Sequence, residues 1–396
     1  MSTDDTTPVI LGGARTPFAR FSGAFAPLSG VELGAAAIRG ALERSGASAA
    51  DVDAVVLGQV IQAGAGQGPA RQAAVLAGLG WDVPAVTINK LCLSGLTAVI
   101  DAARMIRLGE AQVVVAGGQE SMTNAPHLLL GSRSGLGVGP RPLEDALLHD
   151  GLLDPFDRRL MGRVTDDGNA ARGIRRERQD AFAALSHQRA AAARSTGVLA
   201  EEIVPVAVPQ RRGPDLVVSA DDGIRDDSTV ETLARLAPAF SAEGTITAGS
   251  SSPITDGAAA LVVVSRGWAR ERGLPWLATV AEHGQVAGPD NSLHSQPSAA
   301  ILQALGRRGA AVSDLDLIEI NEAFASVVLQ SADDLGVEPE TVNLDGGAIA
   351  LGHPVGASGA RLALHLALAL RRRGGGLGVA ALCGGGGQGE ALILED

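Results

Sequence analysis

The stretch AIRGALERSGASAADVD at residues 37–53 returns as AILQALGRRGAAVSDLD at residues 300–316, at a constant offset of 263 positions and without a gap. Nine residues are identical between the two copies, including the glycine in the middle and the two aspartates near the end. In each copy apolar residues recur at the spacing of one helix face, a glycine ends the pattern, and an apolar strand follows. The chain is therefore predicted to contain the same helix–strand unit twice.

A second pair of segments extends this repeat. Residues 94–118, SGLTAVIDAARMIRLGEAQVVVAGG, are matched by residues 358–385, SGARLALHLALALRRRGGGLGVAALCGG. Each begins with Ser-Gly, continues as a helix of about four turns, passes a glycine and ends in an apolar strand. We expect two alternating β/α halves, each with a largely buried sheet covered by helices.

The segment between the halves has a different character. It is rich in arginine and acidic residues, contains the loop-like run GSRSGLGVGPRP and includes the helical pattern RRERQDAFAALSHQRAAAARSTG. Inserts of this kind often carry binding residues over a rigid scaffold. We predict a loop domain over residues 120–245, an N-terminal half over 1–119 with a return segment at about 246–268, and a C-terminal half over 269–396.

Composition excludes several classes of protein. With 396 residues, 46% of them hydrophobic, the chain can build large cores. A net charge of −12 gives no overall attraction for nucleic acid or an anionic membrane. The longest apolar helical stretch, Leu362 to Leu370, is too short to cross a bilayer, and the acidic start MSTDDTTPVI lacks targeting features. We expect a cytoplasmic protein, with neither nucleic-acid nor membrane partners, whose two cysteines are free thiols.

Cys92, in NKLCLSG at residues 89–95, is either a small buried apolar residue or a nucleophile. It follows the apolar segment AVTIN and precedes a helix that is predicted to begin at Ser94. Its sulfur would then lie near unpaired backbone N–H groups and the positive helix end. Both features favour the thiolate, so a lowered pKa is expected.

The candidate base is His353, in GGAIALGHPVGASG at residues 346–359. It could instead cap the turn before Pro354. However, the repeat sets GASG in the second half opposite CLSG in the first, so a pseudo-twofold fold would bring His353 beside Cys92. An imidazole beside a thiol is an arrangement that activates a cysteine nucleophile.

Two further polar candidates lie at strand ends. Cys383 begins CGGGGQG (383–389), which contains the string G-x-G-x-x-G. A dinucleotide site is rejected because the following EALILED reads as a strand and not as a helix. The glycines would instead let backbone N–H groups approach a substrate closely. Asn321, in NEAFA (321–325), ends a predicted buried strand; it is a site residue or an amide satisfied by a turn.

Taken in order, NKLCLSG, GGQESM (117–122), NEAFA, GGAIALGHPVGASG and CGGGGQG resemble the thiolase family. The segments GGARTPFARFSGAFA (12–26) and TITAGSSSPITDGAAAL (245–261) fit as well, so the resemblance covers essentially the whole chain. It implies an α/β protein with the duplicated thiolase fold. This fold has two mixed five-stranded sheets layered with helices (αβαβα), plus an inserted loop domain that holds coenzyme A.

The resemblance also implies a role for each reactive residue. Cys92 would be the acyl-accepting nucleophile, activated by His353, and Cys383 would move the second proton. His353 and Asn321, the latter through a water, resemble a first oxyanion hole, and the backbone N–H groups of Cys92 and Gly385 resemble a second. The implied reaction is CoA-dependent cleavage of 3-ketoacyl-CoA, or the reverse Claisen condensation. Acyl-CoA and CoA are its substrates, and no metal or other cofactor is expected.

The chain departs from the family at the substrate side. Leu160, in RRLMG, stands where short-chain members commonly have a histidine, and Leu293 begins LHSQP where the family has Met-Gly-x-Gly-Pro. These changes leave the acyl chain length open. Ser252 and Arg225 match positions that would contact the pantetheine and nucleotide ends of CoA, although Arg225 could equally be a solvated surface arginine.

Two other functions remain to be weighed. One is a catalytically silent CoA-ester binding protein with the same fold. The altered sequence of the loop domain is the reason to consider it. The other is a decarboxylating condensing enzyme of the related synthases, which lack a second reactive cysteine; Cys383 favours the thiolase. The resemblance further implies a homodimer or a homotetramer.

Overall fold

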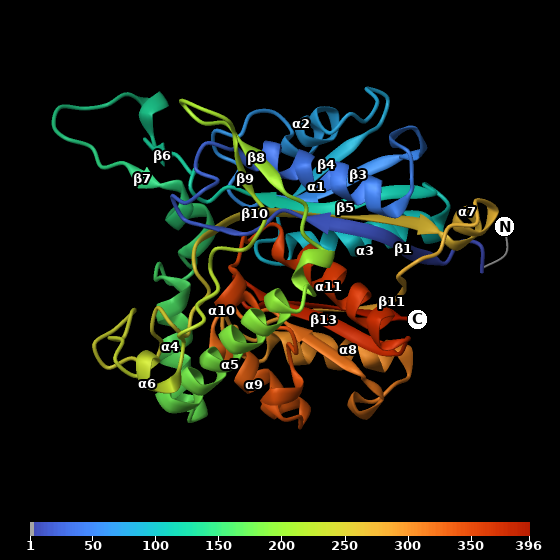
Figure 1. The fold of residues 1–396 in the computed structure, drawn as a ribbon. Helices are drawn as coiled ribbons and strands as arrows, with labels where there is room; N and C mark the ends of the chain where they lie inside the picture. Colours follow the sequence, from blue (N-terminus) through green and yellow to red (C-terminus); the bar gives the residue numbers. More distant parts are fainter. Residues whose placement is uncertain (1–3) are drawn as a thin grey trace.

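The computed structural model describes residues 4–396 and contains two sheet-forming halves that follow the sequence repeat (Figure 1). In the N-terminal half the strand order is β4-β3-β5-β10-β1. β3 runs parallel to β4 and β5, and β10 pairs antiparallel with both β5 and β1. β10 follows the inserted segment in the chain and lies between β1 and β5. The strands are β1 (Pro8–Arg15), β3 (Ala54–Gly58), β4 (Ala85–Ile88), β5 (Val113–Glu120) and β10 (Thr255–Ser265).

The C-terminal half continues the same hydrogen-bonded path, in the order β11-β14-β13-β12. β11, β14 and β13 are antiparallel, β12 is parallel to β13, and β11 joins β1 of the other half through two residue pairs. The fifth position of this sheet holds only an isolated bridge between Ile318 and Val342. The strands are β11 (Ala278–Ala287), β12 (Leu317–Ile320), β13 (Leu377–Gly384) and β14 (Gln388–Glu395).

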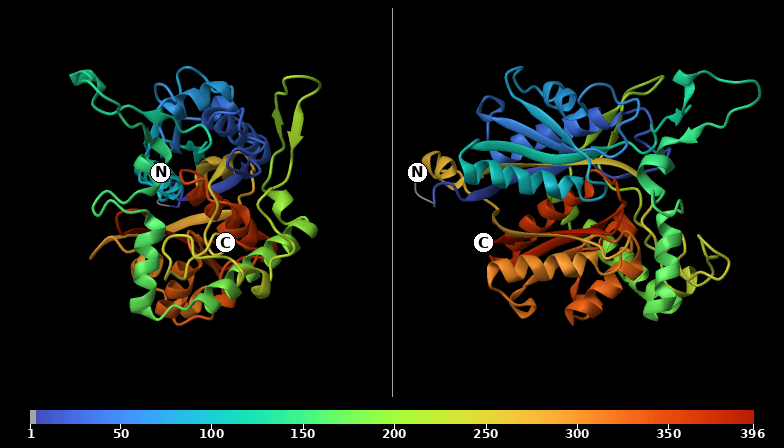
Figure 2. Two further views of the ribbon diagram at one scale, coloured as in Figure 1. Left: turned by 90° about the vertical axis from the view of Figure 1, so that its left-hand side faces the viewer. Right: turned by 180° about the vertical axis from the view of Figure 1, so that it is seen from behind.

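Helices cover both faces of each half. α3 (Ser94–Leu108) and α11 (Ser358–Arg373) pack together between the halves, and share one core with the inner faces of both sets of strands (Figures 1 and 2). On β5, Val114 and Ala116 belong to this core whereas Val113 and Val115 face the outer helices, as the period of a doubly covered strand requires. The outer helices are α1 (Gly30–Ser45) and α2 (Pro69–Leu76) on one side, and α8 (Gln296–Arg308) and α9 (Ala325–Leu335) on the other. The layered α/β fold predicted from the repeat is confirmed.

The inserted segment lies at one end of the layered body, in green and yellow at the left of Figure 1. Its main helices are α4 (Met161–Arg172) and α5 (Arg176–Ser195), with the short α6 (Val230–Leu233). Two hairpins project from it: β6 (His127–Leu128) with β7 (Glu144–Asp145), and β8 (Val206–Val208) with β9 (Leu216–Val218). The remaining elements are β2 (Ala19–Arg20), α7 (Arg266–Glu271), α10 (Ala348–Leu351) and short helical turns at Ala49–Asp51, Ser132–Ser134, Leu147–Leu152, Leu199–Glu201, Val312–Asp314 and Pro339–Thr341.

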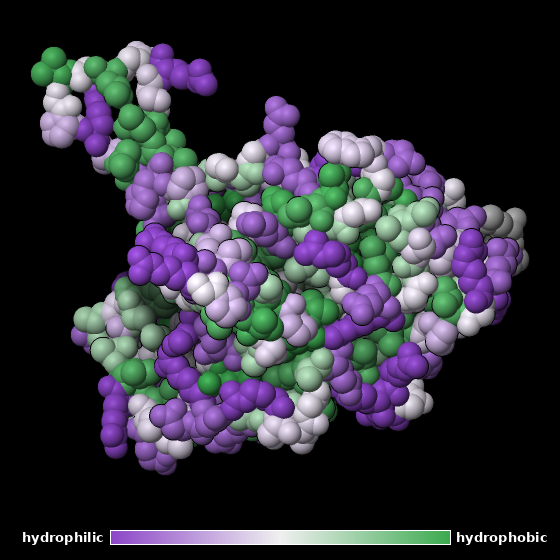
Figure 3. Space-filling view, turned by 45° about the horizontal axis from the view of Figure 1, so that its top comes forward, coloured by the Kyte–Doolittle hydropathy of each residue, from purple (hydrophilic) through white to green (hydrophobic). Residues whose placement is uncertain are grey.

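The surface carries apolar side chains on the projecting arm between β6 and β7, seen at the upper left of Figure 3. Leu130, Leu136, Val138 and Leu143 are exposed there. Over residues 4–396, no helix combines the length and apolar character needed to cross a membrane.

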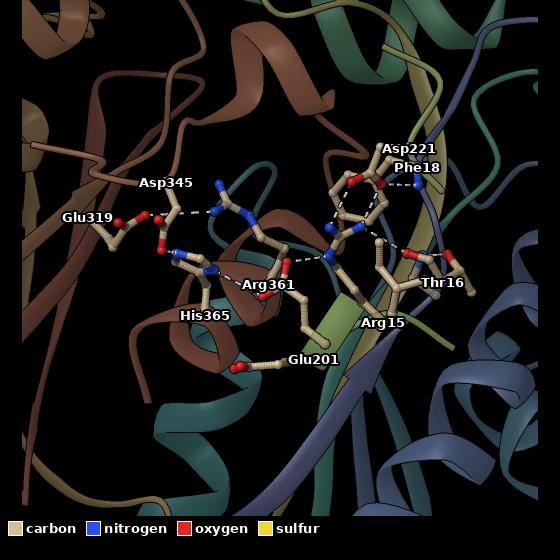
Figure 4. A network of polar contacts seen from close by, with 12 residues as sticks. Arg15, Thr16, Phe18, Glu201, Asp221, Glu319, Asp345, Arg361 and His365 are labelled. Atoms are coloured by element: carbon tan, nitrogen blue, oxygen red, sulfur yellow. Dashed lines mark hydrogen bonds and ion pairs between the residues drawn. The ribbon is translucent and has the colours of Figure 1, made fainter. Parts of the chain in front are cut away.

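A buried ionic network ties the three parts of the chain together (Figure 4). Arg15 on β1 pairs with Asp221 and Glu202 of the inserted segment, each through a 2.6 Å contact. Glu202 also contacts Nδ1 of His365 on α11 at 3.0 Å, and Nε2 of that histidine lies 3.2 Å from Asp345. Because buried charges are stable only when paired, this network is expected to fix how the halves and the insert sit together.

Candidate active site

Six of the predicted site residues line a single cavity of about 270 Å³: Cys92, His353, Cys383, Leu160, Ser252 and Leu293. The residues that line the cavity come from parts far apart in the chain, namely the turn before α3, the loop before α11, the end of β13 and the inserted segment. Cys92 and His353 line the same cavity because each precedes one of the two central helices of the repeat, which pack against each other.

The Cys92 thiol is protonated at neutral pH. Burial raises its pKa to about 11, although the backbone N–H groups of Cys92 and Gly385 favour the thiolate. The lowered pKa that the sequence led us to expect is therefore wrong. Cys92 is only 7% exposed, and the loss of hydration of the thiolate outweighs what the start of α3 and the two N–H groups supply. These N–H groups are the pair that we predicted as the second oxyanion hole.

His353 is held on both ring nitrogens. Nδ1 lies 2.6 Å from Ser358 Oγ, and Nε2 lies 3.4 Å from the Asn321 amide nitrogen. The backbone N–H of His353 donates to Thr255 Oγ1 at 3.1 Å. Burial, assisted by the positive charge of Arg361, lowers the pKa of His353 to about 4. The imidazole is therefore neutral at pH 7, and one of its nitrogens carries a lone pair that can accept a proton.

Cys383 and Asn321 complete the reacting end. The Cys383 side chain is buried beside Leu293 and Ala323. Burial raises the pKa of Cys383, and the negative charge that Cys92 carries once it is ionised raises it further. Asn321 is fully buried, and its Oδ1 forms no hydrogen bond within residues 4–396. A buried amide oxygen of this kind is suited to bind a water or a substrate group.

Two buried carboxylates that the sequence analysis did not single out support these loops. Glu120 accepts N–H bonds from Val60, Ile61 and Gly356 at 2.9, 3.1 and 3.0 Å, and burial raises its pKa to about 8. It thus anchors the loop that carries His353. The motif GGQESM contained this residue, but only its contacts reveal the role.

Glu322 anchors the end of the strand at Asn321 in a similar way. It accepts hydrogen bonds from Ser186 Oγ at 2.6 Å, from Asn343 Nδ2 at 2.9 Å and from the Ile349 N–H at 3.0 Å. Burial raises its pKa. The carboxylate therefore connects α5 of the inserted segment to the NEAFA motif.

The rest of the cavity wall is almost entirely apolar. Phe240 and Phe324 meet edge to face with ring centroids 6.0 Å apart. Leu160 is 38% exposed, whereas Leu293 is 2% exposed. Phe240 had no sequence signal, because it lies in an irregular part of the insert. The other apolar lining residues that sequence reasoning did not single out include Met122, Leu148, Leu152, Met161, Ile254, Phe324 and Val355.

Ser252 and Arg225 have different positions. Ser252 lines the cavity, and its hydroxyl donates to the Ala323 carbonyl at 3.2 Å. Arg225 is exposed and does not line the cavity; its backbone N–H donates to His187 Nδ1 at 3.2 Å. The structure therefore brings Ser252, but not Arg225, to the other predicted residues. Within residues 4–396, no group of three or more His, Cys, Asp or Glu side chains is placed to hold a metal ion.

Comparisons with known proteins agree with this arrangement. Residues 8–267 match the model described as "Thiolase, N-terminal domain", and residues 274–396 match "Thiolase, C-terminal domain". A "Probable acetyl-CoA acetyltransferase" of Mycobacterium tuberculosis is 56% identical over 390 residues, covering 98% of this chain and 99% of the relative. An "Acetyl-CoA acetyltransferase" of Cupriavidus necator is 45% identical over 390 residues, with 98% and 99% covered. The crystal structure of the Bacillus anthracis acetyl-CoA acetyltransferase has a TM-score of 0.96 and 37% identity, with both chains covered completely.

Proposed function

The chain belongs to the thiolase family, and from this membership we propose that it transfers acyl groups between coenzyme A thioesters. The reaction is the CoA-dependent cleavage of a 3-ketoacyl-CoA to acetyl-CoA and a shortened acyl-CoA, or the reverse Claisen condensation. One observation carries the proposal: a thiol, a neutral imidazole and a second thiol, those of Cys92, His353 and Cys383, face one apolar cavity.

In the cleavage direction His353 takes the Cys92 proton as the sulfur bonds to the 3-keto carbon. The bond between C2 and C3 of the substrate then breaks, and acetyl-CoA departs as an enolate that takes its proton from the Cys383 thiol. Coenzyme A then attacks the acyl group on Cys92; its thiol proton goes to Cys383, and His353 returns its proton to Cys92. Acyl transfer between thioesters balances without any redox or metal step, so CoA is proposed as a substrate and no cofactor is invoked.

The apolar cavity wall is relevant to which acyl groups the enzyme accepts. Around the reacting atoms the lining is hydrocarbon, and Leu160 and Leu293 offer no hydrogen bond to the substrate. The names of the relatives make acetoacetyl-CoA the first substrate to test, and the apolar wall is the reason to extend the series to longer hydrocarbon chains. Ser252 and Arg225 are proposed for the pantetheine and nucleotide ends of CoA. Arg225 is exposed and does not line the cavity, which suits only the outer, nucleotide end of CoA.

The deciding experiment measures CoA-dependent cleavage of 3-ketoacyl-CoA esters, from acetoacetyl-CoA to long chains, followed by the intact mass of the protein. We expect turnover and a mass increase equal to one acyl group. Cys92→Ser is expected to remove both, because the hydroxyl lacks the nucleophilicity of the thiol at this position. Full cleavage activity in that variant would refute the acyl-Cys92 intermediate.

A silent CoA-ester binding protein is the alternative from a different class, and nothing in the site or the comparisons favours it. Bound CoA without turnover on any ester in the series would establish it. We further propose that the enzyme acts in the cytoplasm, in fatty acid metabolism, as a homodimer or homotetramer. Sedimentation of the purified protein tests the last point.

A further inference from the structure

The two central helices both begin with a buried serine at equivalent positions of the repeat. Ser94 is the first residue of α3 and Ser358 is the first residue of α11. Ser94 follows Cys92 by two residues, and Ser358 follows His353 by five. Each hydroxyl lies within the turn that presents one of the two reactive side chains.

Ser94 closes the turn that carries the nucleophile. Its Oγ accepts from the Lys90 N–H at 2.8 Å and donates to the Leu91 carbonyl at 2.6 Å. Leu91, immediately before Cys92, has a φ of 53°, in the left-handed region that a leucine rarely adopts. Such a conformation is strained and persists only where neighbouring contacts hold it. The Ser94 hydroxyl bonds on both sides of this residue.

Ser358 fixes the ring of the base. Its hydroxyl donates to the Pro354 carbonyl at 3.0 Å, so its single hydrogen is used there. At 2.6 Å from His353 Nδ1, the same oxygen is then the acceptor, and Nδ1 carries the ring proton. On the other side of the ring, the Asn321 amide nitrogen, which can only donate, faces Nε2 at 3.4 Å. Both contacts fit the same tautomer, with the lone pair on Nε2.

We propose that Ser94 and Ser358 are positioning residues related by the internal repeat. Ser94 holds the turn that presents the Cys92 sulfur, and Ser358 holds His353 with Nδ1 protonated so that Nε2 takes the Cys92 proton. The inference rests on the proposed function for its chemistry, but the positions of the two side chains are independent of substrate. The charged group that acts on the His353 ring is Arg361 of α11. The titratable groups that line the same cavity as His353 are the thiols of Cys92 and Cys383.

The test compares Ser358→Ala and Ser94→Ala with the wild-type enzyme. For Ser358→Ala we expect kcat to fall about 10- to 100-fold, because a correctly oriented general base contributes about 10²- to 10⁴-fold. KM should change less than about twofold, since neither serine lines the cavity. Ser358→Thr retains the hydroxyl and should restore most of the loss. Ser94→Ala is expected to lower kcat to a similar extent by releasing the Leu91 turn.

A second measurement distinguishes a positioning role of the serines from a non-specific effect of the substitutions on the structure. The rate at which iodoacetamide alkylates Cys92, followed by peptide mass, depends on the turn and on the base but requires no substrate. It should fall about tenfold or more in both alanine variants at fixed pH. The matched control is Ser45→Ala in α1, a buried serine whose hydroxyl, like that of Ser94, bonds only to backbone, to the Leu42 carbonyl at 3.0 Å and the Ala47 N–H at 3.2 Å.

The outcomes decide between the readings. A loss of kcat and of Cys92 alkylation in Ser358→Ala, with recovery in Ser358→Thr and no loss in Ser45→Ala, supports the proposal. It is overturned if Ser358→Ala keeps kcat and the alkylation rate within about twofold of the wild type, or loses no more than Ser45→Ala. A wild-type protein that turns over no ester would refute the proposed function instead, and the alkylation rates would still test the two serines.

Discussion

At the scale of single residues, the reacting end of the cavity holds two neutral groups. Burial raises the pKa of Cys92 to about 11 and lowers that of His353 to about 4, so both shifts oppose a resting thiolate–imidazolium pair. The proton transfer between them is therefore unfavourable until negative charge can move onto a substrate oxygen. The N–H groups of Cys92 and Gly385, together with Asn321, are the groups that can stabilise that charge.

The protonation state gives a pH dependence that can be measured without substrate. The thiolate is the species that reacts with iodoacetamide, and a thiol with a raised pKa forms it only at high pH. The alkylation rate of Cys92 should therefore rise about tenfold per pH unit between pH 7 and 10, with no plateau near neutrality. A rate that is constant from pH 6 to 8 would show a resting thiolate and contradict the assignment. The reaction of free cysteine, which levels off above about pH 8.5, is the control.

At the scale of elements, the repeat predicted most of what was found. Apolar periodicity and glycine stops placed the helices now seen as α1, α3, α8 and α11, because these features are local. The missing fifth strand of the second half could not be predicted, since it depends on Asn343. This residue has a φ of 54°, which turns the chain away directly after the bridge at Val342. Its side-chain amide then bonds to both the N–H and the carbonyl of Ile320, each at 2.8 Å. These are backbone groups of β12 with which a fifth strand would have paired.

The amide of Asn343 should therefore contribute to stability as a replacement for the strand. Asn343→Gly keeps the left-handed backbone but leaves the Ile320 groups and Glu322 without this partner, which we expect to cost about 2–4 kcal/mol. Asn343→Ala should cost about 1 kcal/mol more, because alanine is strained at a positive φ. Urea unfolding of the three proteins measures both steps. If the glycine variant unfolds at the wild-type midpoint, the amide is not a structural substitute for the strand.

The same contrast holds for the site. Motif residues such as Cys92, His353 and Cys383 could be located in the sequence because their chemistry restricts the residue type. The wall contributed by Phe240, and the contacts of Glu120 and Glu322, could not, because apolar and acidic residues are common and only the folded chain selects among them. The direction of the Cys92 pKa shift was wrong for a related reason: the helix start is visible in the sequence, but the depth of burial is not.

At the scale of the whole molecule, the halves and the insert are joined by His365, which lies between Glu202 and Asp345 (Figure 4). Although burial alone would lower its pKa, the negative charge of Glu202 and the hydrogen bonds that the ring donates to both carboxylates raise it to about 10. The same contact lowers the pKa of Asp345. The imidazolium is thus a charged cross-link in the folded enzyme, whereas an unfolded chain would release its proton near pH 6.5.

This cross-link makes global stability depend on pH in a defined direction. Because the folded pKa is raised, its contribution is complete below about pH 6.5 and is lost as pH rises to about 10, at up to about 1.4 kcal/mol per unit. The Asp345 contribution has the opposite sense, and is lost as pH falls through its lowered pKa.

His365→Gln should therefore be less stable than the wild type at pH 6, by about 3–5 kcal/mol for a broken buried pair. Denaturant unfolding of both proteins from pH 6 to 10 should show the difference between them shrinking as pH rises. Glu120 also titrates in this range in the folded protein, and the two thiols titrate there once the chain is unfolded, but these groups are common to both proteins and cancel in the comparison. A difference in unfolding free energy that stays constant across the series would mean that His365 is neutral in the folded chain.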